Sequence, residues 1–596
     1  MAWARARNLH RDAVPPQAET RTRWFFTIAL ALMLGLSLKL VYIQVVRRGH
    51  YLDLDGRIHQ GSEPEAPAPG SIYARGMQPL AVSMPAVSIC ASPVQVAASD
   101  RGIDGTAHEL AERAGLDAAQ VRAILQRGAR RKEGFAYLAR LLAPEQVADL
   151  ADAHLDGIWT VREYKRVYPG ERLACHVLGR CSSYHEPMDG IELRWAFVLA
   201  GRPGTRPKHI DAYGRSILGA DAGGALAPEP GRNLVLTLDW GIQQVAEMAL
   251  DDCMERNRPR AATCVVMDPQ TGEILALASR PNFQPGRLEA GTPEEVNERL
   301  KNLPIVRQYE PGSLLKVLLA AAVLTSPRYH EQSYYCAGSA QIGGKPLRCW
   351  ELRGHGNCDL TRMLAKSCNI AAARFALLIG ADHYHAFLRS LGLGRPTGVG
   401  MPGEASGSLR PKEGMYERDL ANLGFGQGVS VTDLQMLRAV CAVVNGGRLM
   451  QPQIVKAVVD AETGEVVREL PPLELGRVCD EQTSAPVRAA MGAVIESGTG
   501  WGAHIEGLRV GGKTGTAQKW VAEEGGFVRG RNIMSFVMIA PLDEPRFAIL
   551  VTADEPQRGE HGADVAAPVA KTVALAALRQ AGLLPEQAEI TEGAGM

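Results

Sequence analysis

The 596-residue chain is long enough for about three or four domains, and its composition, 46% apolar and 22% charged, supports large cores and excludes wholesale disorder. The 65 basic residues balance the 65 acidic residues and only 6% of the chain is aromatic, which argues against a nucleic-acid-binding protein. Eleven cysteines are too few for a disulfide-stapled scaffold of this length.

Residues 24–46 are predicted to form a helix that spans a lipid membrane. The segment is predominantly apolar, with Lys39 its one charged residue, and at 1.5 Å per residue it extends about 34 Å, enough to cross a hydrocarbon core of about 30 Å. Its Leu, Ile, Val and Phe residues contribute roughly −4 to −8 kcal/mol to insertion, which outweighs the ~2.5–3.5 kcal/mol cost of a central lysine. No small-residue cleavage site follows, so we expect an uncleaved signal anchor rather than a removed signal peptide or a core helix. Lys39 either snorkels to the interface or faces a partner helix.

More arginines precede this span than follow it, and this excess favours a cytoplasmic N-terminus. Five precede it and three follow closely: Arg5, Arg7, Arg11, Arg21 and Arg23, then Arg47, Arg48 and Arg57. We therefore expect residues 1–23 to be a cytoplasmic tail. The bulk of the chain is then extracytoplasmic (periplasmic), held to the cytoplasmic (inner) membrane by a single pass.

Residues 216–232 are rich in glycine and proline and are predicted to be a linker. Before it, residues 47–215 mix short strands with Ala-rich amphipathic helices. One such helix is expected to begin at the N-cap Asp117 and to stop at Gly128. Its apolar positions share one face: Val121, Ile124 and Leu125. This part carries no catalytic constellation, so we interpret it as a pedestal or docking domain.

Residues 233–580 are predicted to form an α+β domain. Alternating apolar positions indicate a first strand, followed by a helix: Leu234, Leu236 and Leu238. A hairpin is expected around Asp268–Gly272, and two more strands at 533–541 and 547–554. Strands at both ends with helices between them indicate a sheet that is closed by distant segments. An Ala-rich terminal helix follows, and residues 581–596 are expected to be a tail.

The first chemical motif is S-x-x-K, formed by Ser313 and Lys316 at the start of an apolar helical run. Positions i and i+3 share a helix face, with Cβ atoms about 5–6 Å apart. A serine hydroxyl becomes a good nucleophile when a base takes its proton, and lysine is a base only when it is neutral. Desolvation or a second cation lowers a lysine pKa towards ~7–8 and makes that possible. Alone, the motif is weak, because an ordinary helix start shows the same pattern more often.

Two further motifs follow along the chain. Ser367 and Asn369 form S-x-N at the edge of a helical pattern, where a second hydroxyl can relay a proton and an amide can hold the base. Lys513 begins K-T-G in a glycine-rich segment that leads into a strand. Thr514 and Thr516 would share one face of that strand, and a cation beside two hydroxyls can bind a carboxylate. Each motif alone also fits an ordinary cap or turn.

The order S-x-x-K, S-x-N, K-T-G, with gaps of about fifty and about 145 residues, is much more specific than any single motif. It resembles the triple of class A β-lactamases and penicillin-binding proteins, with Cys368 in the middle of the second motif. With its predicted anchor, the chain resembles a class B penicillin-binding protein, a monofunctional peptidoglycan D,D-transpeptidase. It is most similar to the division-specific (septal) type.

The resemblance covers nearly the whole chain. It extends to four further segments: residues 69–83, 188–205, 425–435 and 498–519. The first of them departs from the family's R-G-x-I-x-D-R-x-G-x-x-L-A box at Pro69, Ala74 and Met77. The implied fold is α+β, with a single transmembrane helix, an elongated pedestal (dimerisation-type) domain, and a penicillin-binding, β-lactamase-like transpeptidase domain. That last domain has an antiparallel sheet with flanking helices.

The resemblance also implies roles for the motif residues. Ser313 attacks the penultimate D-Ala carbonyl of a stem pentapeptide, and Lys316 takes the Ser313 proton. Ser367 and Asn369 order the site and relay protons to the leaving D-Ala. An amine from a neighbouring stem peptide then resolves the acyl-enzyme.

The K-T-G segment is implied to bind the substrate. Lys513 keeps Lys316 neutral, Thr514, Gly515 and Thr516 bind the end of the stem peptide, and the backbone N–H groups of Ser313 and Thr516 form the oxyanion hole. β-Lactams would acylate Ser313 because they imitate the D-Ala-D-Ala end. No metal or organic cofactor is implied, and we interpret residues 355–360 and 185–189 as loops rather than ligands.

The implied partners are peptidoglycan stem peptides, β-lactams, a membrane-embedded glycosyltransferase and divisome proteins. The septal role competes with an elongation-type class B enzyme, which shares all three motifs. A catalytically inactive penicillin-binding scaffold or sensor is a further alternative. A β-lactamase would need a base to activate water, and Glu417 misses the corresponding pattern by one residue.

The sequence does not decide whether two cysteines near the second motif form a disulfide. Cys336 and Cys349 are separated by twelve residues and, in an oxidising compartment, either close a local disulfide or stay as two free thiols. The odd total of eleven leaves at least one cysteine unpaired in a monomer, and Cys368 is a candidate.

Overall fold

The computed structural model describes residues 16–51, 60–150, 153, 155–182, 186–209, 225–287, 290–521 and 526–584. Most of the two predicted tails, residues 210–224 at the predicted linker, and His185 lie outside the described residues. The chain divides into two compact units, Met1–Ala66 with Pro203–Pro228, and Pro67–Arg202 with Glu229–Met596.

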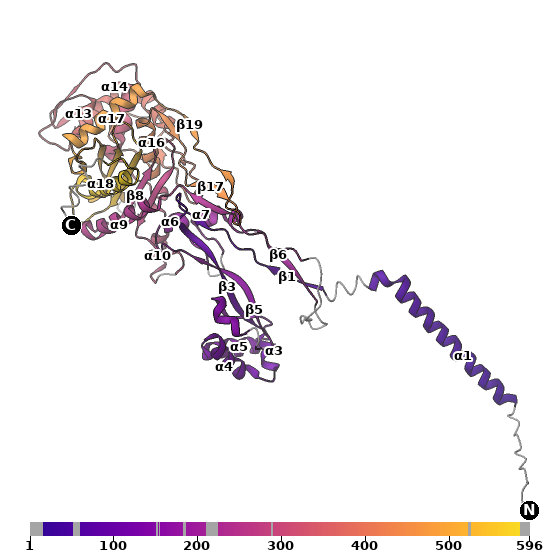
Figure 1. Cartoon of the computed structure of the whole chain (residues 1–596). Helices are drawn as coiled ribbons and strands as arrows, with labels where there is room; N and C mark the ends of the chain where they lie inside the picture. Colours follow the sequence, from indigo (N-terminus) through magenta and orange to yellow (C-terminus); the bar gives the residue numbers. More distant parts are fainter. Residues whose placement is uncertain are drawn as a thin grey trace, which may run out of the picture. The chain divides into compact units, whose positions relative to one another are not determined.

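The first unit contains the predicted anchor. Helix α1 (Pro16–Val41) continues as a π-helical turn over Tyr42–Val46, and Thr20–Val46 is long and apolar enough to cross a membrane (Figure 1). Its apolar side chains are exposed, with Phe25 at 70%. The prediction of a long apolar helix over 24–46 is confirmed. In the same unit β1 (Gln60–Glu65) pairs antiparallel with β6 (Gly204–His209).

The second unit begins with a small α+β head. Strand β3 (Pro79–Ala91) pairs antiparallel with both β4 (Ala136–Leu142) and β5 (Ile158–Val167). Its three larger helices are α3 (Pro93–Ala98), α4 (Gly102–Ala114) and α5 (Ala118–Arg130). The core of the head joins strand and helix positions such as Ile89, Leu110 and Leu125.

Helix α5 confirms one prediction and corrects another. The Asp117 carboxylate accepts a hydrogen bond from the Ala119 amide at 2.8 Å, as expected of an N-cap. Gly128 does not end the helix, which runs on to Arg130. A Cβ atom at Gly128 would lie 2.5 Å from Cγ of Pro93, so this glycine allows α5 to pack closely on α3.

The segment that departs from the family box nevertheless forms a tight turn. The Ala74 amide donates to the Gln78 carbonyl at 2.9 Å, and Met77 adopts a left-handed conformation with φ of 64°. Arg75 forms an ion pair with Glu273 at 3.2 Å. The turn is therefore tied to the hairpin of the C-terminal domain.

A mixed sheet joins the head to the C-terminal domain. Strand β7 (Asn233–Leu236) lies parallel to β2 (Ile72–Tyr73) and antiparallel to β17 (Val455–Val459). The order is β18–β17–β7–β2–β3–β4, with β5 on β3 and β18 at Val466–Glu469. Segments far apart in the sequence therefore share one set of backbone hydrogen bonds.

The C-terminal domain is built on a five-stranded antiparallel sheet in the order β20–β21–β22–β8–β9. The strands are β20 (Gly511–Val521), β21 (Gly526–Ala540), β22 (Phe547–Asp554), β8 (Ala261–Met267) and β9 (Ile274–Arg280). The hairpin and both late strands were predicted, as was the closure by distant segments: β22 pairs with β8.

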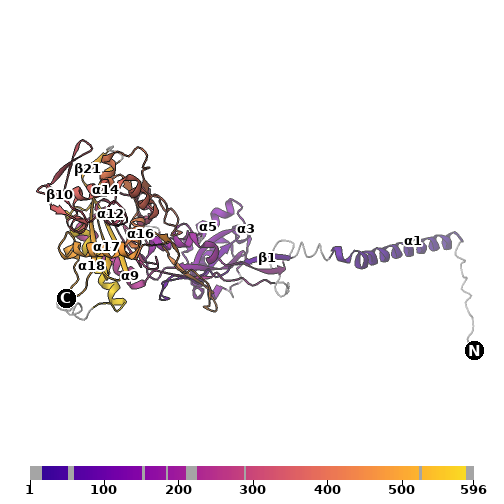
Figure 2. The ribbon, with the colours of Figure 1, turned by 90° about the horizontal axis from the view of Figure 1, so that it is seen from above.

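Helices cover both faces of this sheet. Helices α9 (Trp240–Asn257) and α18 (Gly562–Gln580) lie side by side on one face (Figure 2) and share a core with Phe536 and Met538. The alternate positions Val537 and Ile539 belong to the core of the other face. The helices of that layer are α12 (Leu315–Leu324), α13 (Leu360–Ala365), α14 (Asn369–Ser390), α15 (Glu417–Gly424), α16 (Asp433–Val444) and α17 (Glu481–Glu496).

Short elements complete the described chain. They include α6 (Cys175–Leu178), α7 (Gly190–Arg194), α8 (Ala196–Leu199), α10 (Pro293–Leu300), α11 (Leu303–Val306), β10 (Tyr334–Cys336), β11 (Ser339–Ile342), β12 (Lys345–Arg348), β13 (Gly356–Cys358), β14 (Ser408–Leu409), β15 (Val429–Ser430), β16 (Arg448–Met450) and β19 (Glu474–Arg477).

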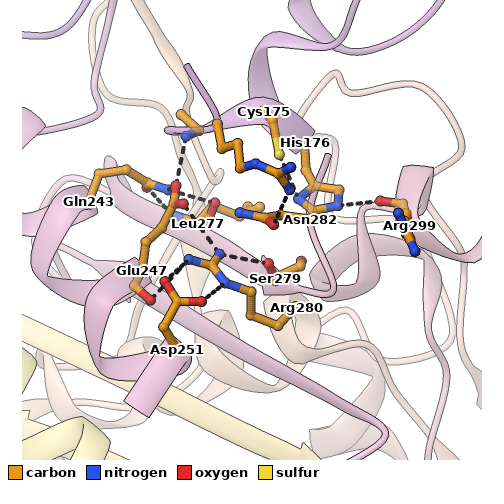
Figure 3. Close-up of polar contacts among 12 residues, drawn as sticks. Cys175, His176, Gln243, Glu247, Asp251, Leu277, Ser279, Arg280, Asn282 and Arg299 are labelled. Atoms are coloured by element: carbon orange, nitrogen blue, oxygen red, sulfur yellow. Dashed lines mark hydrogen bonds and ion pairs between the residues drawn. The ribbon is translucent and has the colours of Figure 1, made fainter. Parts of the chain in front are cut away.

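A polar network ties the head to α9 and β9 (Figure 3). The Glu247 carboxylate accepts hydrogen bonds from the backbone amide of Ala174 at 2.7 Å and from the side-chain amide of Gln243 at 2.9 Å. Its other oxygen lies 3.2 Å from the Arg280 guanidinium, which also pairs with Asp251 at 2.5 and 2.7 Å. Arg280 and Glu247 are largely buried, so the network fixes the start of α6 against the C-terminal domain.

Candidate active site

Ser313 and Lys316 meet at the start of the central helix. A 3₁₀ turn over Gly312–Leu314 leads into α12, whose residues from Leu315 to Val323 are all buried because the helix is apolar on every face. The Lys316 amine lies 3.1 Å from the Ser313 hydroxyl. The predicted contact across one helical turn is present, and the serine stays half-exposed while the lysine is fully buried.

The S-x-N segment surrounds the same amine. Lys316 Nζ donates to the Ser367 carbonyl and to Asn369 Oδ1, both at 2.7 Å, and lies 3.2 Å from the Ser367 hydroxyl. Ser367 connects α13 to α14 in a left-handed conformation with φ of 52°, which is uncommon for a residue with a side chain. This backbone bend presents both its carbonyl and its hydroxyl to one lysine.

Lys513 reaches the site from β20. Its amine donates to the Ser367 hydroxyl at 3.0 Å and to the Thr514 carbonyl at 3.0 Å. The Ser367 hydroxyl therefore lies between the amines of Lys316 and Lys513. The structure brings all five predicted catalytic residues together from three segments of the chain.

Burial sets the protonation of the two lysines. Desolvation lowers the pKa of Lys316 from its ordinary 10.5 to about 8. Desolvation, followed by the charge of Lys316, lowers the pKa of Lys513 well below 10.5. Two buried amines on either side of one hydroxyl resist being charged together, so a neutral amine is available as a base near pH 7.

The K-T-G residues lie on an edge strand. Among the strands that the structure describes, β20 pairs with β21 alone, so one side of its backbone is open at the site. Thr514 is nearly buried and Thr516 is exposed. A Cβ atom at Gly515 would lie 2.2 Å from the Ser535 hydroxyl and 3.0 Å from Leu314, so glycine is required for β20 to approach the nucleophile turn.

Two residues of the site, Thr499 and Gly426, were not predicted from the sequence. Thr499, in the loop after α17, places its hydroxyl 2.9 Å from the Thr514 hydroxyl. The Gly426 carbonyl accepts a hydrogen bond from the Gly312 amide at 3.2 Å, and a Cβ atom at Gly426 would lie 2.0 Å from the Gly312 oxygen. Both residues lie in segments that carried the family resemblance, which was the available signal. Glu417, by contrast, is exposed at the first residue of α15.

A cluster of sulfur atoms lies directly behind the S-x-N segment. Cys336 and Cys349 are free thiols, and both sulfurs face Nδ1 of His355, at 3.8 and 3.6 Å. Cys368 is the N-cap of α14, where its sulfur accepts from the Ala371 amide at 3.4 Å. The local disulfide that the spacing left open is not formed.

Comparisons with known proteins agree with this geometry. A family model described as penicillin binding protein transpeptidase domain matches residues 262–575, and one described as penicillin-binding protein dimerisation domain matches residues 64–236. Peptidoglycan D,D-transpeptidase FtsI of Escherichia coli is 30% identical, over 94% of this chain and 91% of its own length. Stage V sporulation protein D of Bacillus subtilis is 33% identical, over 76% of this chain and 69% of its own length.

Solved structures show the same fold. Penicillin-binding protein 2X of Streptococcus thermophilus has a TM-score of 0.73 at 24% identity, and the match covers 90% of this chain and 82% of that one. Penicillin-binding protein 3 of Mycobacterium tuberculosis, solved with aztreonam, has a TM-score of 0.65 at 26% identity, covering 87% and 98%. The family binds β-lactams and peptidoglycan. This chain therefore belongs to the class B penicillin-binding proteins and is a serine-type peptidoglycan D,D-transpeptidase.

Proposed function

We propose that this enzyme cross-links stem peptides through an acyl-enzyme on Ser313, and that it does so during septal cell-wall synthesis. The observation that carries the proposal is the position of the Lys316 amine, 3.1 Å from the Ser313 hydroxyl and bound to Ser367 and Asn369. A neutral, dry amine in hydrogen-bond contact with a half-exposed hydroxyl is the arrangement that nucleophilic acyl transfer requires.

In the first step the Ser313 oxygen attacks the carbonyl carbon of the penultimate D-Ala, and the hydroxyl proton moves to Lys316. The bond to the terminal D-Ala then breaks, and the leaving nitrogen takes a proton through the Ser367 hydroxyl, which contacts both lysines. The amine of a second stem peptide attacks the Ser313 ester, and its displaced proton returns to Ser313. Asn369 holds Lys316 in place throughout.

The open edge of β20 is proposed to hold the stem peptide. The hydroxyls of Thr514 and Thr516 bind its terminal carboxylate beside the Lys513 amine, and Gly515 leaves room for the peptide backbone. The amides of Ser313 and Thr516 stabilise the oxyanion. A β-lactam presents a carboxylate and a strained amide in the same relation, so it acylates Ser313 and stays there.

We further propose the following organisation of the chain: a cytoplasmic tail at 1–23, a membrane anchor at 24–46, a pedestal at 47–215, a linker at 216–232, the transpeptidase domain at 233–580 and a tail at 581–596. The apolar exposed helix and the surrounding arginines support this orientation, with the enzymatic domain outside the cytoplasm. A membrane-embedded glycosyltransferase and divisome proteins are the partners that this arrangement would serve.

A fluorescent penicillin tests the nucleophile. The wild-type chain in detergent should be labelled covalently, and Ser313→Ala should lose the label. Lys316→Ala should slow labelling by about 10²–10⁴-fold while the fold persists, because the base is removed. Ser326→Ala, two residues beyond the C-terminal end of α12, is the matched control and should label normally. Labelling that survives Ser313→Ala would assign the nucleophile to another residue.

Depletion of the protein in its own bacterium tests the septal role. If it acts only at the septum, cells should keep growing in length without dividing. Cells that instead lose their elongated shape would identify an elongation-type enzyme, and the chemistry at Ser313 would stand unchanged.

A further inference from the structure

Four side chains from four separate segments converge behind the active site. Cys336 ends β10, Cys349 follows β12, His355 precedes β13, and Cys368 caps α14. The pairing of β10 with β13 sets Cys336 opposite Gly356, which brings His355 to the sulfurs. Their four ligand-type atoms all lie within 4.8 Å of one another.

The distances match the edges of a metal-centred tetrahedron. With Zn–S bonds of about 2.3 Å and Zn–N bonds of about 2.1 Å, tetrahedral geometry separates two sulfurs by about 3.8 Å and a sulfur from a nitrogen by about 3.6 Å. The sulfurs of Cys336 and Cys349 lie 3.8 and 3.6 Å from His355 Nδ1. The imidazole thus points a ring nitrogen, a good metal ligand, at the thiols.

The donor set selects the metal. Three sulfurs and one imidazole suit Zn²⁺, whereas Mg²⁺ and Ca²⁺ require oxygen ligands. The three cysteines are 0–3% exposed, which leaves no open coordination position for a water. A disulfide would use two of the sulfurs and leave the third and the His355 nitrogen without a function.

We propose that Cys336, Cys349, His355 and Cys368 bind one structural Zn²⁺ ion. Its effect on the enzyme follows from the place of Cys368, between Ser367 and Asn369 in the chain. Both neighbours hold the Lys316 amine at 2.7 Å. The metal therefore fixes the S-x-N segment from behind, and Cys368 is a positioning residue rather than a catalytic one.

The first test is the metal content of the full-length chain, purified in detergent without chelator or added reductant. We expect about one Zn²⁺ per chain by elemental analysis and, after exchange with Co²⁺, the thiolate charge-transfer and d–d bands of a tetrahedral site. His355→Cys keeps four ligands and should keep the metal. His355→Ala should weaken Zn²⁺ binding by more than about 100-fold, since loss of a ligand exceeds a change in its surroundings.

Cys358→Ser is the matched control, because Cys358 is buried beside Cys368 but outside the group of four. It should retain the metal. Two results would overturn the proposal: a wild-type chain without stoichiometric zinc whose mass is lower by two hydrogens, which identifies a disulfide, or loss of zinc in Cys358→Ser with retention in Cys336→Ser.

A second measurement separates this inference from the proposed function. Ser313→Ala should contain the same zinc as the wild type although it no longer reacts with penicillin. Chelation of the wild type should slow penicillin acylation and lower the melting temperature, and added Zn²⁺ should restore both. Chelation that removes zinc without changing the acylation rate would refute the coupling to Ser367 and Asn369.

Discussion

The Lys316 amine is dry, yet every polar contact it makes is with an oxygen. Hydrogen bonds to the Ser367 carbonyl and Asn369 Oδ1 favour the charged form, and burial opposes it. Burial prevails and lowers the pKa to about 8. The neutral fraction therefore increases as pH rises, from about one-tenth at pH 7 to about nine-tenths at pH 9.

This pKa predicts the pH dependence of acylation. If neutral Lys316 is the base, the rate of penicillin acylation should rise about tenfold per pH unit below pH 8 and level off above it. Stopped-flow measurements on the full-length chain with a fluorescent penicillin check this. A rate that is flat between pH 6 and pH 8 would mean that a group with another pKa controls the step.

At the level of single residues, the sequence predicted those sites whose spacing is itself a signal. Ser313 and Lys316 lie one helical turn apart, and the order of the three motifs identified Ser367 and Lys513. Thr499 and the thiol cluster were missed because folding, not spacing, creates them. The irregular intervals from Cys336 to Cys368 match no metal motif, and the β10–β13 pairing that brings His355 to Cys336 is a product of the fold.

Among the elements, α9 and β9 have a role beyond the core, since they hold the head through Glu247. The buried Arg280 side chain depends on Glu247 and Asp251 for its counter-charge, and Asp251 is mostly exposed. The Ala174 backbone amide donates its hydrogen bond to the same carboxylate. One carboxylate thus serves a buried cation and a buried backbone donor.

Glu247→Ala should therefore destabilise the protein by about 3–5 kcal/mol, the usual cost of breaking a buried ion pair. Glu247→Gln can still accept from the Ala174 amide and should cost less. Thermal unfolding followed by tryptophan fluorescence compares the two. We also expect faster limited proteolysis near α6 in the alanine variant. An alanine variant as stable as the wild type would show that the pair contributes little.

The elements that were predicted correctly are those with strong local patterns, such as the Asp117 cap and the strands at 533–541 and 547–554. Gly128 was misjudged because glycine ends many helices, and the sequence gives no sign that Pro93 lies against it. The four residues of β7 do not indicate its partners, β2 and β17, because both lie far from it in the sequence.

On the scale of the whole molecule, α1 carries exposed apolar side chains along its length. Such a surface is stable in lipid and not in water. The predicted gain of roughly 4–8 kcal/mol from its Leu, Ile, Val and Phe residues exceeds the cost of Lys39. The helix is thus expected to retain the protein at a membrane without help from other segments.

Deletion of residues 1–51 should move the protein from the membrane fraction to the soluble fraction, while Lys39→Leu should leave it in the membrane. Centrifugation after washes with high salt and alkaline carbonate, with immunoblotting of both fractions, measures the distribution. Release of the full-length protein by salt alone would show that α1 lies on the surface rather than across the bilayer.

Strand β7 also determines which fragments of the protein can be expressed in soluble form. It completes hydrogen bonds on β2 to one side and on β17 to the other, although the chain between its two partners spans most of the molecule. A fragment that ends at residue 232 leaves the β7-facing edge of β2 unpaired, and one that starts at residue 237 leaves that of β17 unpaired. Such unpaired strand edges promote aggregation. Soluble expression for inhibitor screening or crystallisation therefore calls for a single piece that keeps both matched family regions and the junction between them.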